Sequence, residues 1–179
     1  MYPKGEQQTG LILIGRRMRV LVTFTILVLL LCFGATTSLT AGPFEDGIAA
    51  VQAGDYPTAI RLWRPLADQG NNAAQFKLGQ IYRDGKGVKQ DYAAAVVLFT
   101  KAADQGNAQA RYNLGLMYFL GQGVTQDYVQ AHKWLNLAAA RLEAKPREIT
   151  LGMLDYVAEH MTPTQIAEAQ KQAREWMPK

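Results

Sequence analysis

The sequence has 179 residues, of which 49% are hydrophobic, and a formal net charge of +4 at pH 7. Four of its 19 basic residues precede position 20, and from Pro43 onward 15 basic residues face 14 acidic ones. The nearly neutral part after the basic start gives no electrostatic reason to expect nucleic-acid binding. The single cysteine, Cys32, lies inside an apolar run, so the residues after it contain no thiolate nucleophile, disulfide or cysteine metal ligand.

Residues 20–33 form this apolar run, and they follow three arginines at Arg16, Arg17 and Arg19. A run of about fourteen residues matches the apolar region of a secretory signal better than the roughly 20 residues that span a bilayer. We therefore expect residues 1–41 to be a signal peptide, cleaved after Ala41 or Thr37, and the protein to be periplasmic or secreted. The alternative is an uncleaved anchor that contacts the inner membrane through residues 20–33 and faces the periplasm.

Residues 44–70 are predicted to form a first pair of helices. Asp55-Tyr56 and Ala59 recur 36 positions later as Asp91-Tyr92 and Ala95, but this unit lacks a Gly-x-Gly loop. We expect it to be an N-terminal capping hairpin, closer to a tetratricopeptide hairpin than to a complete repeat. Pro57 lies in a first helical turn, where proline is tolerated, whereas Pro65 lies deeper and is predicted to kink or end the helix.

The next two units, residues 71–106 and 107–141, show the strongest signal in the sequence. Residues 67–103 and the segment 36 positions later share 18 identities in 37 pairs. A repeated period of this length is typical of stacked helical repeats. The identical pairs include Asn71 with Asn107, Leu78 with Leu114, Gly79 with Gly115, Tyr82 with Tyr118, Gly85 with Gly121, and Asp91 with Asp127.

Each of these units is predicted to contain two antiparallel helices. Asn71 and Asn107 directly follow glycines, so each is placed to cap the first helix after a helix stop. Gly79 and Gly115 lie in mid-helix, where they let a neighbouring helix approach closely. After a Gly-x-Gly-Val loop, an aspartate caps the second helix. Neither helix buries its apolar face alone, so successive pairs are expected to stack on one another.

These residues resemble the Sel-one-like repeat family, relatives of the tetratricopeptide repeat. The family pattern places Ala, Leu-Gly and Tyr on the first helix, a Gly-x-Gly-Val loop, and Asp, Ala, an aromatic pair and Lys-Ala-Ala on the second. Residues 74–106 follow it almost completely, whereas residues 110–139 have Leu137 in place of the lysine and no closing glycine. The resemblance implies an all-α fold, a short right-handed α-solenoid of antiparallel helix pairs with helical caps.

After Arg141 the period stops, and residues 145–177 are expected to form a C-terminal helical cap. Pro146 begins a new segment, and Thr162-Pro163-Thr164-Gln165 has the pattern of a capping box at a helix start. The following polar helix, residues 163–176, carries apolar residues along one side only. Solenoids need terminal units with a polar outer surface, which this helix supplies.

No group in the sequence predicts a chemical step. His132 and His160 lack further ligands at metal-binding spacing on their own helices, and we expect surface or partly buried side chains there. The Gly-x-Gly loops have no preceding strand and no following Lys-Ser or Lys-Thr, so they fail the test for a phosphate loop. Trp63, Phe99 and Trp134 follow the repeat spacing and are predicted to be core. We expect no cofactor, no metal ion and no small-molecule ligand.

We expect binding residues at the positions where the units 71–106 and 107–141 differ from each other. Residues 83 and 84 are charged in one unit and are replaced by an apolar pair at 119 and 120 in the next, and residues 75 and 77 are replaced at 111 and 113. The apolar pair either forms a contact patch or meets the terminal cap. The predicted partner-binding candidates are Arg83, Arg111, Asn113, Phe119 and Leu120.

The resemblance implies a non-enzymatic interaction or scaffold module of the bacterial cell envelope. Its concave helical surface would bind an extended or helical segment of another protein. One alternative is a β-lactam-binding or hydrolytic enzyme of the same fold, but relatives linked to β-lactams have cysteine-paired repeats, which residues 42–179 lack. The other alternative is a membrane-tethered adaptor that keeps its leader.

Overall fold

The computed structural model describes residues 42–176, which contain eight α-helices and no strand. The predicted leader, residues 1–41, lies outside the described residues. Within the described range, no helix is long and apolar enough to cross a bilayer. In chain order the helices are α2 (Pro43–Gln52), α3 (Tyr56–Asp68), α4 (Asn72–Asp84), α5 (Tyr92–Asp104), α6 (Ala108–Leu120), α7 (Tyr128–Ala139), α8 (Ala144–Ala158) and α9 (Pro163–Glu175).

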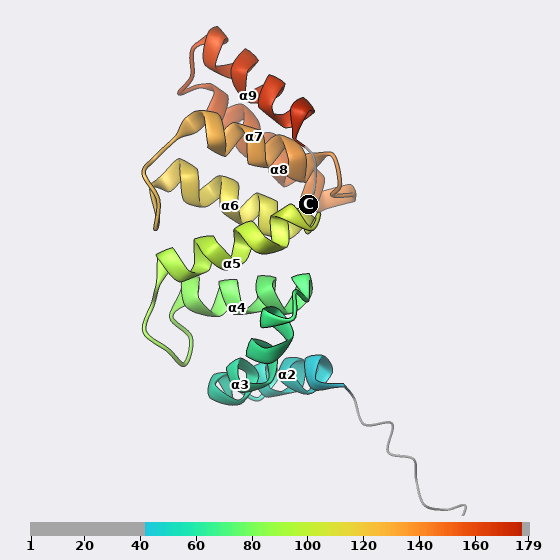
Figure 1. The fold of residues 1–179 in the computed structure, drawn as a ribbon. Helices are drawn as coiled ribbons and strands as arrows, with labels where there is room; N and C mark the ends of the chain where they lie inside the picture. Colours follow the sequence, from blue (N-terminus) through green and yellow to red (C-terminus); the bar gives the residue numbers. More distant parts are fainter. Residues whose placement is uncertain (1–41, 177–179) are drawn as a thin grey trace, which may run out of the picture. The chain divides into compact units, whose positions relative to one another are not determined.

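The helices stack as consecutive pairs, α2 with α3, α4 with α5, and α6 with α7 (Figure 1). The loops between α4 and α5 and between α6 and α7 project from the same side of the stack, on the left in Figure 1. Each second helix also packs against the first helix of the following pair. This arrangement confirms the predicted all-α solenoid of antiparallel helix pairs.

The predicted N-caps explain where the helices begin. The side chain of each capping residue accepts a hydrogen bond from the backbone amide three residues later, at 2.8–3.1 Å, so one amide that lacks a partner in the helix is satisfied. The prediction of capping is therefore confirmed for both complete repeats, and Asp55 caps α3 of the first pair in the same way. The caps are Asp55, Asn71, Asp91, Asn107 and Asp127.

The helix boundaries near two prolines refine the sequence predictions. Pro65 does not end α3, which continues for three more residues to Asp68. Proline removes only one hydrogen bond and its side chain is exposed, while Trp63 and Ala67 on the same helix are buried and hold it in place. At the other end of the chain, α8 begins at Ala144, two residues before Pro146, because proline is compatible with a first helical turn.

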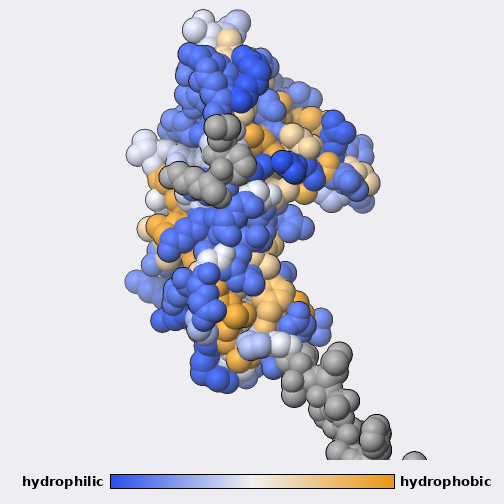
Figure 2. Space-filling view, turned by 45° about the vertical axis from the view of Figure 1, so that its right-hand side comes forward, coloured by the Kyte–Doolittle hydropathy of each residue, from blue (hydrophilic) through white to orange (hydrophobic). Residues whose placement is uncertain are grey.

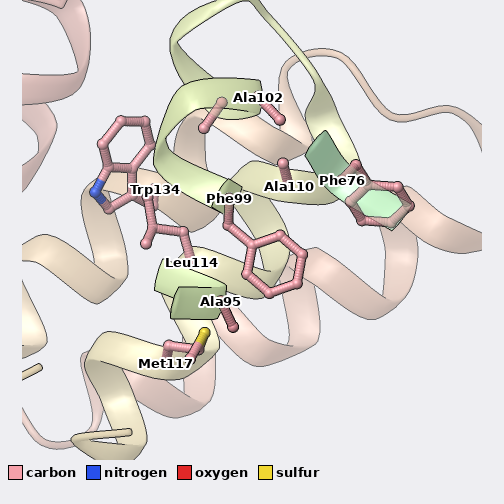
Figure 3. Packing of buried hydrophobic residues seen from close by; sticks show 9 residues of the cluster. Phe76, Ala95, Phe99, Ala102, Ala110, Leu114, Met117 and Trp134 are labelled. Carbon is pink, nitrogen blue, oxygen red and sulfur yellow. The ribbon is translucent and has the colours of Figure 1, made fainter. Parts of the chain in front are cut away.

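The seam between the second and third pairs forms the largest cluster of buried apolar residues (Figure 3). Phe99 of α5 is completely buried, and its ring lies 5.9 Å from that of Phe76 on α4. Leu114 and Met117 of α6 face the same cluster and are also buried. Burying side chains of this size stabilises the fold by about 1.5–3 kcal/mol each, so each pair depends on its neighbour.

Gly79 and Gly115 allow each first helix to lie close to its own second helix. A Cβ atom added at Gly79 would lie 2.7 Å from Phe99 Cε1, and one added at Gly115 would lie 2.8 Å from Leu135 Cγ. Both distances are too short for non-bonded carbon atoms. The predicted role of these glycines in close helix approach is confirmed.

The C-terminal helices both pack on α7. α9 begins with the predicted capping box, in which Thr162 and Gln165 bond each other's backbone amides. The apolar side of α9 faces inward, with Ala169 completely buried. At the end of α9, the ring of Trp176 lies edge-on to that of Trp134, 5.9 Å away. These contacts fix α9 against α7.

Candidate functional site

A hollow of about 550 Å³ lies between α4, α6 and α8. The first helices of two successive repeats form its floor, and the beginning of α8 forms one side. Aliphatic, aromatic and amide side chains dominate the surface, which is typical of a recognition site. The lining residues are Ala73, Phe76, Lys77, Gln80, Asn107, Gln109, Tyr112, Asn113, Leu142, Pro146, Ile149 and Thr150.

A second hollow, of about 310 Å³, continues from the first toward α2. Lys77 and Gln80 line both hollows, so the two form one groove along the first helices. We refer to this surface as the first-helix groove. The space-filling view shows the hollowed face, with hydrophobic residues at its margins (Figure 2). The second hollow is lined by Ile48, Val51, Gln52, Tyr56, Trp63, Lys77, Gln80, Ile81, Asp84 and Lys86.

The repeat pattern explains which residues reach the groove. On α4, Ala74 and Leu78 are buried in the seams, whereas the side chains at positions 73, 76, 77 and 80 line the groove. One period later, the corresponding groove positions on α6 are 109, 112 and 113, which replace 73, 76 and 77. Because the buried side of each first helix is fixed by packing against the neighbouring helices, the opposite side of that helix always faces the groove.

The charged residues at the groove differ in whether they form ion pairs. Asp84 lies 2.7 Å from Arg83 Nε and 3.3 Å from Lys86 Nζ, so three charges form a small network. Partial burial raises the pKa of the Asp84 carboxyl, but the bonds and charges of Arg83 and Lys86 outweigh that effect and hold it below its usual value. Lys77 takes part in no ion pair within the described part of the chain.

Two of the predicted candidates, Arg83 and Asn113, come together at the groove. Arg83 Nη1 of α4 donates a hydrogen bond to Asn113 Oδ1 of α6, and thus links adjacent repeats. Asn113 Nδ2 donates to the carbonyl oxygen of Gln109 at 2.7 Å. Asn113 lines the first hollow, whereas Arg83 lines neither hollow.

Arg111, a third candidate, lies in the core with only 2% of its surface exposed. Its guanidinium donates to the carbonyl oxygens of Ala103 at 3.1 Å and Leu137 at 3.3 Å, and lies 4.3 Å from the centroid of the Trp176 ring. Burial and the nearby charge of Arg141 lower the pKa of Arg111. The structure thus places Arg111 under the C-terminal end of α9, away from the groove.

Phe119 and Leu120 lie at the end of α6, apart from the other candidates. The Phe119 ring lies between 5.6 and 5.7 Å from the rings of Tyr128, Tyr156 and His160, so Phe119 meets the terminal cap. Leu120 remains 55% exposed. The candidates therefore do not form one site: Arg83 and Asn113 meet at the groove, Phe119 and Leu120 lie together at the end of α6, and Arg111 lies in the core.

The histidines differ from each other in environment. His132 is 1% exposed, so the expectation of a surface or partly buried side chain is wrong for this residue. Its Nδ1 atom has no hydrogen-bond partner among the residues that the structure describes, and burial lowers the pKa of its imidazole. His160 is exposed and its Nδ1 lies 3.0 Å from the carbonyl oxygen of Tyr156. In residues 42–176 no cluster of three or more potential ligands is placed to hold a metal ion.

Sequence reasoning missed several groove residues, including Lys77, Gln80, Tyr112 and Ile149. Three of these residues follow the helical spacing of the repeat. Lys77 and Gln80 lie three positions apart on one first helix, and Tyr112 corresponds to position 76, four positions before Gln80. Ile149 had no such signal, since α8 lies outside the period. Its place at the groove depends on how α8 packs against α7.

Comparison with known proteins places these features among repeat proteins. The family model "Sel1 repeat" matches residues 44–71, 72–107 and 108–141, so the N-terminal helix pair also matches it. No curated protein sequence matches this chain.

Two solved structures share the fold. A protective antigen of uropathogenic Escherichia coli strains, displaying an SLR fold, is 29% identical with a TM-score of 0.69; the match covers 74% of this chain and 28% of the antigen. A Sel1 repeat protein from Oxalobacter formigenes is 31% identical with a TM-score of 0.59, over 74% of this chain and 55% of that protein. The matched part thus spans well under two thirds of either relative.

Proposed function

Because this chain belongs to the Sel1 repeat family, whose repeats generally act as protein-interaction modules, we propose that it binds a segment of a partner protein in the first-helix groove. The observation that carries this proposal is the groove itself. It runs over successive first helices, is mostly apolar, and is bordered by amide side chains and by one lysine that pairs with no acid among residues 42–176. Such a surface suits recognition of a chain segment better than a chemical step.

The proposed role is that of a non-enzymatic scaffold in the bacterial cell envelope. The basic and apolar start of the sequence supports export, followed either by cleavage or by retention as an inner-membrane anchor. N-terminal sequencing of the protein isolated from an envelope fraction distinguishes the two forms. A new N-terminus near residue 42 supports the free periplasmic form, and an intact N-terminus supports the anchor.

Site-specific photocrosslinking in cells tests the binding role. A photoreactive amino acid at Gln80 or Gln109 points into the groove, whereas the same residue at Val97 or Lys101 lies on the exposed side of α5. We expect a discrete adduct from both groove positions and none from the α5 positions. Equal adducts from all four positions, or none from the groove, would contradict the proposal.

A further inference from the structure

Lys77 lies at the junction of the two hollows, because it lines both of them. Its side chain is half-buried, and its ammonium group lies 5.8 Å from the centroid of the Phe76 ring on the groove floor. The first hollow contains no carboxylate among its lining residues. In the second hollow the only carboxylate, Asp84, is already bonded to Arg83 and Lys86. The groove thus presents a positive charge that this part of the chain leaves unpaired.

An ammonium group beside apolar surface interacts more strongly with a carboxylate than it does in open water, because the local dielectric is lower. The equivalent position in the next repeat is Asn113, which bonds Arg83 and the Gln109 carbonyl and so belongs to the frame of the repeats. Lys77 makes no such bond among the described residues. Its charge is therefore available to a ligand.

The amides of the groove indicate the conformation of that ligand. The side chains of Gln80 and Gln109 line the groove, and within residues 42–176 neither is engaged in a hydrogen bond. Amide side chains carry donors and acceptors that match the backbone groups of an extended chain. A helical ligand would satisfy its own backbone groups and leave these amides without partners. Ile149, which is 53% exposed at the groove margin, offers an apolar contact beside them.

We propose that the occupant of the first-helix groove is an extended segment of a partner protein with an acidic side chain that pairs with Lys77. An apolar side chain of the same segment packs on Ile149, and its backbone bonds Gln80 and Gln109. This inference rests on the proposed function and adds to it the chemical class of the partner. It predicts selection for acidic sequences and an affinity that falls with rising salt.

Peptide selection on the purified full chain tests the proposal. A random dodecapeptide display library is selected on the protein, and the affinity of the enriched peptides is measured by fluorescence anisotropy. We expect enrichment of an acidic residue next to an apolar one. Lys77→Gln should weaken binding about tenfold, as expected for a partly buried charge pair. The matched control Lys89→Gln, an exposed lysine outside both hollows, should leave it unchanged.

Ala73→Trp, at a half-buried position that lines the first hollow, fills that hollow and so separates the claim of groove binding from the claim of an acidic partner. If Ala73→Trp abolishes binding but the peptides carry no acidic residue and Lys77→Gln binds equally well, the acidic partner is excluded and the groove remains the site. If no peptide binds, or if Ala73→Trp has no effect, the proposed function itself fails. Lys77→Glu should reverse the preference toward basic peptides, and an unchanged preference would overturn the role of Lys77.

Discussion

The two complete repeats, residues 72–107 and 108–141, make the same contacts with different side chains. Gln75 Nε2 donates to the carbonyl oxygen of Ala67 at 3.0 Å, and Arg111 Nε donates to that of Ala103 at 3.1 Å. In both repeats the donor follows its acceptor by eight residues and satisfies a carbonyl at the end of the preceding helix. A difference in residue type between repeats therefore does not by itself indicate a binding role.

The groove-facing positions of the same two repeats differ in contacts as well as in type. Asn113 is hydrogen-bonded to Arg83 and to the Gln109 carbonyl, whereas Lys77, one period earlier, takes part in no ion pair in the described region. The buried pair, Gln75 and Arg111, thus makes the same hydrogen bond with different side chains. The groove pair differs, because Lys77 lacks the hydrogen bonds that Asn113 makes. A side chain such as Lys77, which takes no part in the contacts that hold the repeats together, is available for a ligand.

The largest expected effect is the difference in stability between a substitution in the buried seam and one in the groove. Phe99→Ala should lower the free energy of unfolding by about 3–5 kcal/mol, because it empties a completely buried ring position. Ile149→Ala, at a side chain that is 53% exposed, should cost about 1 kcal/mol or less but weaken binding of a groove peptide. Urea unfolding of the full chain measures the first effect and fluorescence anisotropy the second. Similar stabilities for the two variants would refute the distinction.

The next effect tests the shared contact of Gln75 and Arg111. Arg111→Leu leaves the carbonyl oxygens of Ala103 and Leu137 without their donor and should cost about 1–3 kcal/mol. Arg111→Gln restores the residue type found one period earlier and should recover part of that loss through the bond to Ala103. The same unfolding measurement applies. If both variants keep the wild-type stability and lose peptide binding, Arg111 is a ligand contact and not a seam residue.

A smaller loss of stability is expected from substitution of Gly115, which lets α6 lie close to α7. An alanine Cβ at position 115 would lie 2.8 Å from Leu135 Cγ and 3.1 Å from the Ala131 carbonyl oxygen, and Leu135 is completely buried. Gly115→Ala should therefore destabilise by about 1–2 kcal/mol, after a gain in helix propensity is counted. Gly152→Ala is the matched control, since nothing lies within 4 Å of that Cβ position on α8. It should stabilise by about 0.5–1 kcal/mol.

The smallest effect concerns pH and the buried histidine of α7. Burial lowers the pKa of His132 from its ordinary 6.5, and the charge of Asp155 opposes this in part. The unfolded chain therefore binds the proton more readily, so stability is complete above the unfolded value and falls as the pH drops below it. Melting temperatures at about pH 7.5 and 5.5 should fall further for wild type than for His132→Leu. An equal decrease in both proteins would contradict this role of His132.

The parts of the fold that depend on local sequence were predictable. The N-caps and the capping box at Thr162 depend on side chains within three residues, and Gly79 and Gly115 follow from the period. Of the two outcomes expected at Pro65, a kink or a helix end, the helix end does not occur, because buried neighbours on α3 keep the helix intact beyond it. The burial of His132 could not be foreseen, since it depends on helices that pack on α7 from outside the period.

The groove was only partly predictable for the same reason. A concave binding surface was expected, but the chosen residues were those that vary between repeats, and variation also occurs where a seam contact is kept, as at Arg111. In the sequence, Lys77 stands out only as the residue that Asn113 replaces one period later. Its importance depends on the absence of a partner among the described residues, which no sequence pattern reveals.

Chemical-shift perturbation on the isotopically labelled full chain tests the central claim most directly. Titration with a peptide selected on the protein should shift amide signals in the segments 73–80, 109–113 and 142–150, which contain residues that line the first-helix groove. Signals from the exposed side of α5, around Val97 and Lys101, should stay in place. Shifts confined to α5 and to the outer side of α7, with none on the first helices, would contradict a binding groove on this face.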